Sequence, residues 1–291
     1  MTVSRHPRLF CFGFGASAAA LARRLAPEGF AVAGTTRDRE KAETMLTGGI
    51  EAFPFDGNEP LAEGALDGAT HVLVSIPPGE AGDPVLRQAR AALEEARPLW
   101  VGYLSTTGVY GNRDGGRVDE GSALRPTSER ARRRVQAELA WQRFGEESGL
   151  AVHVFRLAGI YGPGRSVLDD LRAGRARRID KPGHVFSRIH VDDIAAVLAA
   201  SMARPRAGAV YNVCDDEPAE PRAVVEYGAR LLGLESPPVA RFDPEALSDM
   251  ARSFWADCKR VDNSLIKREL GVALRYPTYR EGLDAILAAG G

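Results

Sequence analysis

The chain has 291 residues, which suffices for one large domain or two closely joined ones, and 44% of them are hydrophobic. With 38 basic and 39 acidic residues the formal net charge is −1, so no overall charge would draw the protein to nucleic acid or to a membrane surface. We expect neither a membrane-spanning segment nor a signal peptide, and the three cysteines lack zinc-like spacing. We therefore expect a cytoplasmic protein without a metal site.

A glycine-rich turn near the N-terminus is the first functional signal. The apolar run Arg8–Phe12 leads into Gly13-Phe14-Gly15, and an alanine-rich helical pattern follows. Strand, tight turn and helix start in this order are typical of a dinucleotide-binding site. Gly13 would form the turn, Gly15 would admit a pyrophosphate, and the exposed amides of the helix start would bind its charge. The residues predicted to form this cradle are Gly13, Gly15, Ala16, Ser17 and Ala18.

Short apolar runs then alternate with helical patterns through two thirds of the chain. Further strands are predicted at Phe30–Thr35, Ile50–Pro54, His71–Ile76, Leu99–Leu104, Ala151–Leu157 and Val210–Val213. Helices are predicted at Asp38–Leu46, Asp83–Ala96, between Thr127 and Glu147, from Val191 to Met202 with Asp192 as N-cap, and at Ser264–Leu270 and Tyr279–Ala288. Repeated strand–helix units predict an α/β fold, a Rossmann-type doubly wound parallel sheet with helices on both faces.

The pattern loosens after Tyr161. We expect residues 1–161 to form a dinucleotide-binding domain, to which residues 187–213 return. Residues 162–186 and 214–291 are expected to form mainly a small C-terminal substrate lobe and the C-terminal helices. The polar, glycine-rich stretch Gly111–Arg125 is predicted to be a mobile loop.

The end of the second strand bears on the choice of cofactor. NAD-binding proteins place an Asp or Glu there for the adenosine ribose, but this chain has Gly34-Thr35-Thr36-Arg37. Arg37 can bind a 2′-phosphate and stack on adenine, and Thr36 can donate to the same phosphate, which predicts NADP rather than NAD. Alternatively, Arg37 only faces solvent. In either case Asp38 is expected to cap the next helix. The other predicted cofactor contacts are Asp56 after the third strand and Ser75, Ile76 and Pro77 at the end of the fourth.

Several phrases in the rest of the chain together resemble one family. They are Ser-Thr-Thr-Gly-Val-Tyr-Gly at 105–111, Arg-Leu-Ala-Gly-Ile-Tyr-Gly-Pro-Gly at 156–164, Arg-Ile-His-Val-Asp-Asp-Ile-Ala at 188–195, Tyr-Asn-Val at 211–213 and Lys-Arg-Val-Asp-Asn at 259–263. In this order they resemble the extended short-chain dehydrogenase/reductase superfamily, the NAD-dependent epimerase/dehydratase group. The resemblance spans residues 8 to about 283 and implies a nicotinamide cofactor.

Two departures make the chain resemble the atypical branch of that superfamily. The glycine turn has the form G-x-G-x-x-A instead of T-G-x-x-G-x-x-G. The family's Tyr-x-x-x-Lys pair, which serves as acid/base and ribose-binding cation, falls by position on Arg130 and Arg134. Arg134 can supply the positive charge of the lysine but cannot transfer protons, because its pKa is too high. Alternatively, these arginines form a solvated helix face.

The resemblance also implies candidate catalytic and substrate residues. Thr106 lies where the family places its catalytic Ser/Thr, four residues before Tyr110. Thr106 either bonds a substrate oxygen or caps its own loop. Tyr110 either transfers a proton, with a cation lowering its pKa, or packs under the loop. Tyr161 would shape the substrate pocket, Arg165 would contact an anionic group, and Arg188 would reach a diphosphate or pair with a nearby aspartate.

Two functions follow. The first is an NAD(P)-dependent, epimerase/dehydratase-like oxidoreductase acting on a small, sugar-like carbonyl or hydroxyl compound, with Thr106, Tyr110 and Arg134 as its catalytic residues. Tyr110 or a water molecule would transfer the proton. The second is an NADP-binding redox sensor or regulatory protein without turnover, which the missing Tyr-x-x-x-Lys pair supports. No nucleic-acid or membrane partner is expected, and a homodimer is expected only by analogy with the family.

Overall fold

The computed structural model describes residues 6–290, and at residues 249 and 250 the backbone alone. The chain divides into two compact units. Unit 1 consists of Met1–Ser105, Arg133–Arg156 and Ile194–Tyr211, and unit 2 of Thr106–Arg132, Leu157–Asp193 and Asn212–Gly291. The expected assignment of a cofactor domain and a substrate lobe stays a prediction. Among the described residues no helix is long and apolar enough to cross a membrane.

The main sheet has seven parallel strands in the order β11-β7-β5-β4-β1-β2-β3. The strands are β1 (Arg8–Phe12), β2 (Ala31–Thr36), β3 (Glu51–Pro54), β4 (His71–Val74), β5 (Trp100–Thr106), β7 (Val152–Leu157) and β11 (Val210–Val213). The chain starts in the middle of the sheet and builds outward first on one side and then on the other, which is the doubly wound order. The predicted fold class is therefore confirmed.

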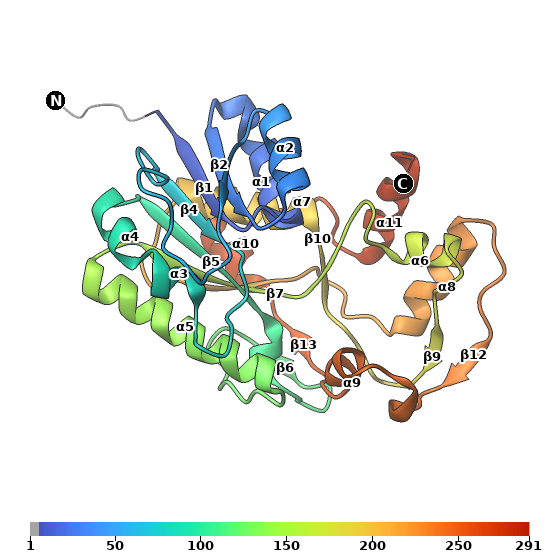
Figure 1. Cartoon of the computed structure of the whole chain (residues 1–291). Helices are drawn as coiled ribbons and strands as arrows, with labels where there is room; N and C mark the ends of the chain where they lie inside the picture. The colour runs from blue at the N-terminus through green and yellow to red at the C-terminus, as the bar shows by residue number, and fades with distance from the viewer. Residues whose placement is uncertain (1–5, 291) are drawn as a thin grey trace. The chain divides into compact units, whose positions relative to one another are not determined.

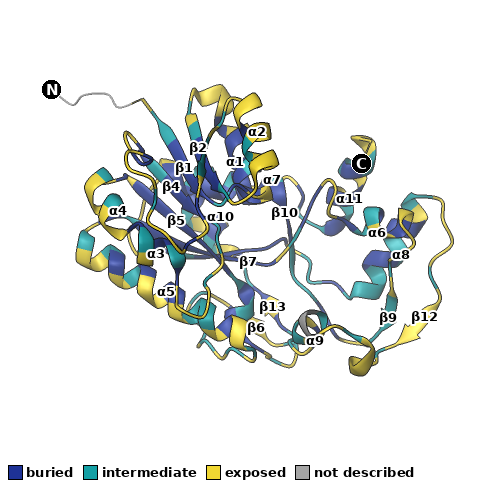
Figure 2. Cartoon of the chain, viewed as in Figure 1, coloured by how far each residue is buried: buried dark blue, intermediate teal, exposed yellow. Residues whose placement is uncertain are grey.

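The sheet is buried because helices cover both of its faces. These helices are α1 (Ala16–Leu25), α2 (Arg39–Thr47), α3 (Pro84–Gln88), α4 (Arg90–Ala96), α5 (Glu129–Ser148) and α7 (Val191–Ala203), with a short 3₁₀ turn at Ala26–Glu28. Figure 1 shows α1 and α2 on one side of the strands and α4 and α5 on the other. The central strands are accordingly continuous apolar runs, and Figure 2 shows them buried.

One predicted helix is interrupted, one predicted N-cap is wrong and one is confirmed. The helix expected over Asp83–Ala96 is two helices, because the chain leaves helical geometry at Ala89 (φ −131°). Asp83 caps the first of them by accepting from the amides of residues 85 and 86 at 3.0 and 3.1 Å. Asp192 is not an N-cap, since α7 starts one residue earlier. Asp38 does cap α2, accepting from the amide of Lys41 at 3.2 Å.

Unit 2 is built from short elements. They are a 3₁₀ turn at Thr107–Tyr110, β6 (Arg117–Val118), β8 (Gly159–Tyr161), α6 (Val167–Arg172), β9 (Arg178–Asp180), β10 (Arg188–His190), α8 (Pro221–Leu231), β12 (Val239–Arg241), a 3₁₀ turn at Pro244–Ala246, α9 (Asp249–Trp255), β13 (Arg260–Val261), α10 (Ser264–Leu270) and α11 (Tyr279–Ala288). Three parallel two-stranded pairs form, β10 with β8, β12 with β9 and β13 with β6. Side chains of α6, α8 and α11 form its main apolar cluster.

The stretch Gly111–Arg125 differs from the predicted mobile loop. It contains β6, which pairs with β13 near the end of the chain. The amides of Arg113 and Gly115 also donate to the carbonyl of Cys258, each at 3.0 Å. The prediction missed this pairing because the partner segment lies more than a hundred residues away in the sequence and only the fold brings it near.

Candidate functional site

The glycine turn of unit 1 has a backbone that only glycine adopts readily. Gly13 has φ +82°, and a Cβ there would lie 2.9 Å from Ser75 Oγ and 3.0 Å from Ile76 Cγ1. The Gly13 amide donates to Thr35 Oγ1 at 2.8 Å, and the Phe14 amide donates to the Thr35 carbonyl at 3.0 Å. The turn is thus held against β2 on one side and against the end of β4 on the other.

Free amides follow at the start of α1. Within the described residues the N–H groups of residues 15–18 have no hydrogen-bond partner, and the first intrahelical bond runs from Ala19 to the Gly15 carbonyl at 2.9 Å. A Cβ on Gly15 would meet nothing within 4 Å, so a ligand has room to approach. The first turn of α1 carries no acidic residue. Unpaired amides at the positive end of a ten-residue helix fit a diphosphate group.

The end of β2 presents a cation and no free carboxylate. Arg37 is exposed, and no hydrogen bond or ion pair involves it among the described residues. Thr36 Oγ1 accepts from the Asp38 amide at 3.1 Å. Asp38 itself caps α2. Asp38 thus caps the helix, as expected under either alternative, and the role of Arg37 stays a prediction.

The other predicted cofactor contacts lie at the carboxyl ends of neighbouring strands. After β3, Asp56 is exposed and accepts from the amide and side chain of Asn58 at 2.8 and 2.9 Å, and these bonds lower its pKa. After β4, Ser75 and Ile76 are half-buried beside Gly13, and Pro77 is exposed. The carboxyl ends of β1, β2 and β4 meet at one edge because these strands are neighbours. Unit 1 therefore brings Ser75 and Ile76 next to Gly13, as predicted, whereas the threonine that bonds Gly13 is Thr35 and not the predicted Thr36.

Arg134 lies on α5 and is bound to the end of β5. Its Nη1 donates to the hydroxyl of Tyr103 at 2.9 Å and to the carbonyl of Leu104 at 2.8 Å. The guanidinium carbon lies 5.7 Å from the centroid of the Tyr103 ring. Arg134 is therefore an anchored cation rather than part of a solvated face, whereas Arg130 is exposed. The anchoring of Arg134 shows where its side chain lies, and its catalytic role stays a prediction.

The turn after β5 places Thr106 and Tyr110 differently. Thr106 is half-buried and its Oγ1 accepts from the Gly108 amide at 3.1 Å, which leaves its own hydrogen available for donation. Tyr110 is completely buried, and its hydroxyl donates to Asn212 Oδ1 at 2.6 Å. Tyr110 therefore has the geometry of the packing alternative. The catalytic roles of both residues stay predictions.

Sequence reasoning missed Lys259, a buried cation of unit 2. Its Nζ donates to the Gly111 carbonyl at 3.1 Å and lies 3.2 Å from Asp257 Oδ2. Of the four lysines in the chain, all within the described residues, Lys259 alone is buried. Burial lowers its pKa, and the nearby Asp257 carboxylate opposes that shift. The scarcity of lysine in the sequence was the available signal, since a chain that uses arginine almost everywhere has placed one lysine here.

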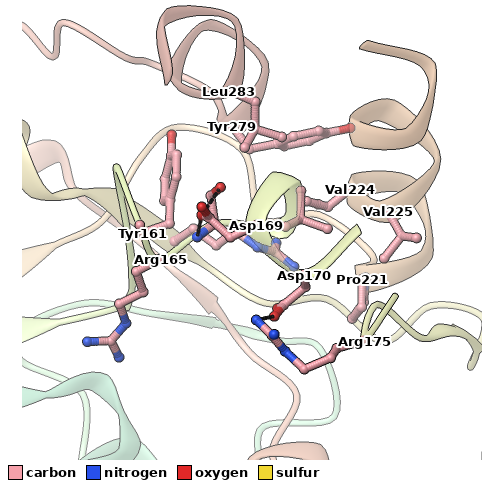
Figure 3. A pocket seen from close by; sticks show the side chains of 14 residues that line it. Tyr161, Arg165, Asp169, Asp170, Arg175, Pro221, Val224, Val225, Tyr279 and Leu283 are labelled. Carbon is pink, nitrogen blue, oxygen red and sulfur yellow. Dashed lines mark hydrogen bonds and ion pairs between the residues drawn. The ribbon is translucent and has the colours of Figure 1, made fainter. Parts of the chain in front are cut away.

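The three predicted substrate residues surround one cavity of unit 2 (Figure 3). Its volume is about 410 Å³, and its walls come from the turn after β8 and from α6, α8, β10 and α11. Tyr161 is buried, and its hydroxyl donates to the Thr278 carbonyl at 3.4 Å. Arg165 is exposed on the turn. Figure 3 shows Val224, Val225 and Pro221 on the α8 side and Tyr279 with Leu283 on α11.

Arg188 brings positive charge to this cavity. Its Nη1 donates to the carbonyls of Phe186 and Ala219 at 2.8 and 3.1 Å. Burial lowers its pKa, while the nearby carboxyl of Asp215 opposes that shift. Asp215 is itself buried, and burial raises its pKa to about 8, against the attraction of Arg188. Asp169, Asp170 and Arg175 also line the cavity, and Arg175 Nη2 pairs with Asp170 Oδ1 at 3.1 Å, so the lining carries charges of both signs.

No cluster suited to a metal ion occurs in the part of the chain that the structure describes. No group of three or more His, Cys, Asp or Glu side chains converges there. The expectation of a protein without a metal site stays a prediction. The described geometry thus offers two features for ligands, a cradle for a diphosphate in unit 1 and a cavity lined by charges of both signs in unit 2.

Comparison with known proteins identifies relatives over nearly the whole chain. The model of the "NAD dependent epimerase/dehydratase family" matches residues 85–214 of this chain. Protein YeeZ of Escherichia coli (strain K12) is 29% identical over 283 residues, covering 91% of this chain and 94% of that protein. The solved structure of a functionally unknown conserved protein from Silicibacter pomeroyi DSS is 52% identical, with a TM-score of 0.90 and 97% and 99% of the two chains covered. A dTDP-glucose 4,6-dehydratase from Bacillus anthracis str. Ames in complex with NAD is 16% identical, with a TM-score of 0.78 and 97% and 96% covered, which shows a shared fold.

Proposed function

Because the chain belongs to the NAD-dependent epimerase/dehydratase family, we propose that it binds NADP in preference to NAD and acts as an oxidoreductase of that kind on a small, sugar-like carbonyl or hydroxyl compound. The observation that carries the proposal is the run of free amides at residues 15–18, together with the unpaired Arg37 at the end of the adjacent strand. The amides fit the diphosphate that NAD and NADP share. Arg37 fits the 2′-phosphate that distinguishes them.

The choice of NADP rests on charge at the end of β2. The family description and the related dehydratase name NAD. An NAD site uses a carboxylate against the ribose hydroxyls, and such a carboxylate would repel a 2′-phosphate. Asp38, the nearest carboxylate in the sequence, is bound to the start of α2. Arg37 remains to attract the phosphate, which supports NADP.

Calorimetric titration with NADP and NAD tests the cofactor assignment. We expect the wild type to bind NADP more tightly and Arg37→Gln to lose about tenfold in affinity for NADP, because a charged hydrogen bond disappears. Its affinity for NAD should change little. Arg39→Gln is the matched control, since Arg39 is also exposed and begins α2. An equal loss in both variants, or tighter binding of NAD by the wild type, would overturn the NADP assignment.

The cavity of unit 2 is the proposed substrate site. Arg188 supplies a cation to a lining in which Arg175 already pairs with Asp170, and Arg165 stands exposed on the turn after β8. Valine and tyrosine side chains supply apolar and aromatic wall. A substrate with an anionic group and a ring suits these walls. The related dehydratase is named for dTDP-glucose, so nucleotide sugars are the first class of compound to test.

Residues near the end of β5 would orient the substrate and the nicotinamide ribose. The nicotinamide, when bound, supplies the hydride chemistry. Thr106 would donate its free hydroxyl hydrogen to the substrate oxygen, and a water molecule would transfer the proton. Tyr110 is unsuited to that transfer because its hydroxyl is buried against Asn212. Arg134, anchored by one nitrogen, keeps other N–H groups for the nicotinamide ribose.

A screen of carbonyl compounds and nucleotide sugars with NADPH, followed by absorbance, tests turnover. Thr106→Val should lower kcat at least tenfold, because the substrate oxygen loses its donor. Tyr110→Phe should retain turnover, because the Tyr110 hydroxyl is buried and donates to Asn212. Loss of turnover in Tyr110→Phe with an intact fold would instead assign the proton transfer to Tyr110.

The second candidate function is binding of NADP without turnover, as in a redox sensor or regulatory protein. The absence of a Tyr-x-x-x-Lys pair and the burial of the Tyr110 hydroxyl favour it. In that case NADP raises the melting temperature of the protein, while no carbonyl compound or nucleotide sugar in the screen consumes NADPH. Turnover that Thr106→Val abolishes would exclude this candidate.

A further inference from the structure

Two buried or half-buried hydroxyl groups hold the backbone of Gly13 from opposite sides. Thr35 Oγ1, on β2, accepts from the Gly13 amide at 2.8 Å. Ser75 Oγ, just after β4, donates to the Gly13 carbonyl at 2.6 Å and lies 3.2 Å from the Phe12 carbonyl. Since β1 lies between β2 and β4, the turn is clamped by both neighbouring strands.

We infer that Thr35 and Ser75 are positioning residues of the phosphate cradle, holding Gly13 so that the amides of residues 15–18 face the diphosphate. The inference rests on the proposed dinucleotide binding. Neither hydroxyl needs to touch the ligand. Their effect on affinity passes through the backbone of the turn.

The hydrogen bonds of the turn support a positioning role. The amides of Gly13 and Phe14 both donate to Thr35, so neither is available to a phosphate. Phe14 is buried, and a Cβ on Gly34 would lie 2.9 Å from its ring, so β2 also holds the turn by packing. The free amides begin only at Gly15. Where the phosphate-binding amides point therefore depends on how Thr35 and Ser75 hold the preceding residues.

Removal of the Thr35 hydroxyl would destabilise the conformation of the Gly13 turn. Thr35 is 1% exposed, so bulk solvent does not reach the position of the lost acceptor. The Gly13 amide would be left unpaired in a turn whose φ of +82° only glycine adopts readily. The turn can relieve this only by moving, and moving it misaligns the free amides.

Thr70, the residue before β4, provides a matched control because its hydroxyl also bonds the backbone of β1. Its Oγ1 accepts from the Arg8 amide at 2.8 Å and donates to the Arg8 carbonyl at 3.0 Å. Thr70 is 3% exposed and lies at the opposite end of β1 from Gly13. Thr70→Val therefore removes the same kind of side-chain bond to β1, far from the cradle, and reports the structural contribution alone.

The experiment compares Thr35→Val, Thr35→Ser, Ser75→Ala and Thr70→Val by calorimetric titration with NADP and with adenosine 2′-phosphate, beside thermal melting. We expect Thr35→Val and Ser75→Ala to bind NADP about five- to tenfold more weakly, while Thr35→Ser, which keeps the hydroxyl, restores the affinity. Adenosine 2′-phosphate has no diphosphate, so its affinity should stay within about twofold of wild type. Thr70→Val should melt earlier yet bind NADP normally.

The outcomes separate this inference from the function on which it rests. If the wild type binds NADP and Thr35→Val binds it equally well, the positioning role is overturned while the proposed function stands. Equal loss for NADP and adenosine 2′-phosphate would also overturn it, because the effect would then not pass through the diphosphate cradle. If the folded wild type binds neither pyridine dinucleotide, both the proposed function and the inference fall.

Discussion

A guanidinium at position 134 changes what this site can do with protons. Arg134 is held by Tyr103 and Leu104, so it is fixed in place as a cation. Burial raises the pKa of the Tyr103 phenol, and the charge of Arg134 only partly opposes that shift. The Tyr103 phenol therefore keeps its proton near neutral pH. Arg134 therefore provides a fixed positive charge but no group that can transfer a proton. For this reason the proposed mechanism uses a water molecule for the proton transfer.

Lys259 is the second cation whose environment sets its role. Its ammonium bridges Gly111 and Asp257, and Asp257 Oδ1 also accepts from Thr127 at 2.7 Å. The lysine and aspartate side chains are only 10% and 11% exposed. This buried pair ties the turn after β5 to the C-terminal part of unit 2.

We predict that Lys259→Met lowers the free energy of unfolding by about 2 kcal/mol, because Asp257 would be left as a buried charge without its cation. The double variant Lys259→Met/Asp257→Asn should lose less free energy of unfolding than the two single variants lose together, since the two residues interact directly. Lys267→Met is the control, because Lys267 is exposed in an ion pair with Asp216. Urea denaturation measures all four variants. Equal losses for Lys259→Met and Lys267→Met would contradict the prediction.

At the scale of elements, α5 is attached to the sheet by a buried charge network. Glu138, on α5, is 1% exposed; it accepts from Arg156 Nη2 on β7 at 2.8 Å and from Ser105 Oγ on β5 at 2.5 Å. One carboxylate thus joins a helix to two strands. Because Arg134 is on the same helix, the attachment also fixes where that guanidinium meets β5.

Glu138→Gln should therefore destabilise the protein by about 3 kcal/mol, because it removes the charge that balances a buried guanidinium. Glu129→Gln is the matched control: Glu129 is on the same helix and forms an exposed ion pair with Arg132. Glu129→Gln should lower the free energy of unfolding only slightly, since exposed ion pairs contribute little to stability. Chemical denaturation of the two variants side by side tests this. Comparable losses would mean that the buried network does not attach α5.

At the scale of the whole molecule, buried histidines make stability depend on pH. His153 is completely buried; its Nε2 accepts from the Arg206 amide at 2.8 Å, and its Nδ1 lies 3.3 Å from the Val101 carbonyl. Both contacts suit the neutral ring with a proton on Nδ1, and burial lowers its pKa to about 4. The pKa values of His71 in unit 1 and His184 in unit 2 are likewise lowered to about 4 by burial.

His153 makes the free energy of unfolding fall as the pH falls, because the unfolded state takes up a proton before the folded state does. An unfolded histidine takes up its proton near pH 6.5, whereas folded His153 stays neutral down to about pH 4. Its contribution is therefore complete above pH 6.5 and is lost as the pH falls from 6.5 to 4, amounting to about 3 kcal/mol. Urea unfolding from pH 7.5 to pH 4.5 should show this loss in the wild type and a smaller one in His153→Gln. His6→Gln, at an exposed position, should follow the wild type. Parallel curves for all three proteins would contradict the assignment.

Local patterns in the sequence predicted the sheet, the glycine turn and the cap at Asp38. Each depends on residues close in the chain: apolar runs form strands, glycines permit a positive φ, and an aspartate before a helix meets its first amides. The Asp83–Ala96 prediction was wrong because a continuous helical pattern does not reveal a break at Ala89. The pairing of Gly111–Arg125 was missed because a polar stretch looks the same whether or not a distant strand adopts it.

By itself the sequence determined that an α/β sheet carries free helix amides and an arginine at the ends of its first two strands, since both features follow from short-range order. Tertiary structure alone decided which side chains hold those features in place. Gly13 meets Thr35 across 22 residues, Tyr110 meets Asn212 across 102, and Lys259 meets Gly111 across 148. Hydrogen bonds of this kind depend on which segments become neighbours in the fold, and no local pattern of residues encodes a neighbour that distant.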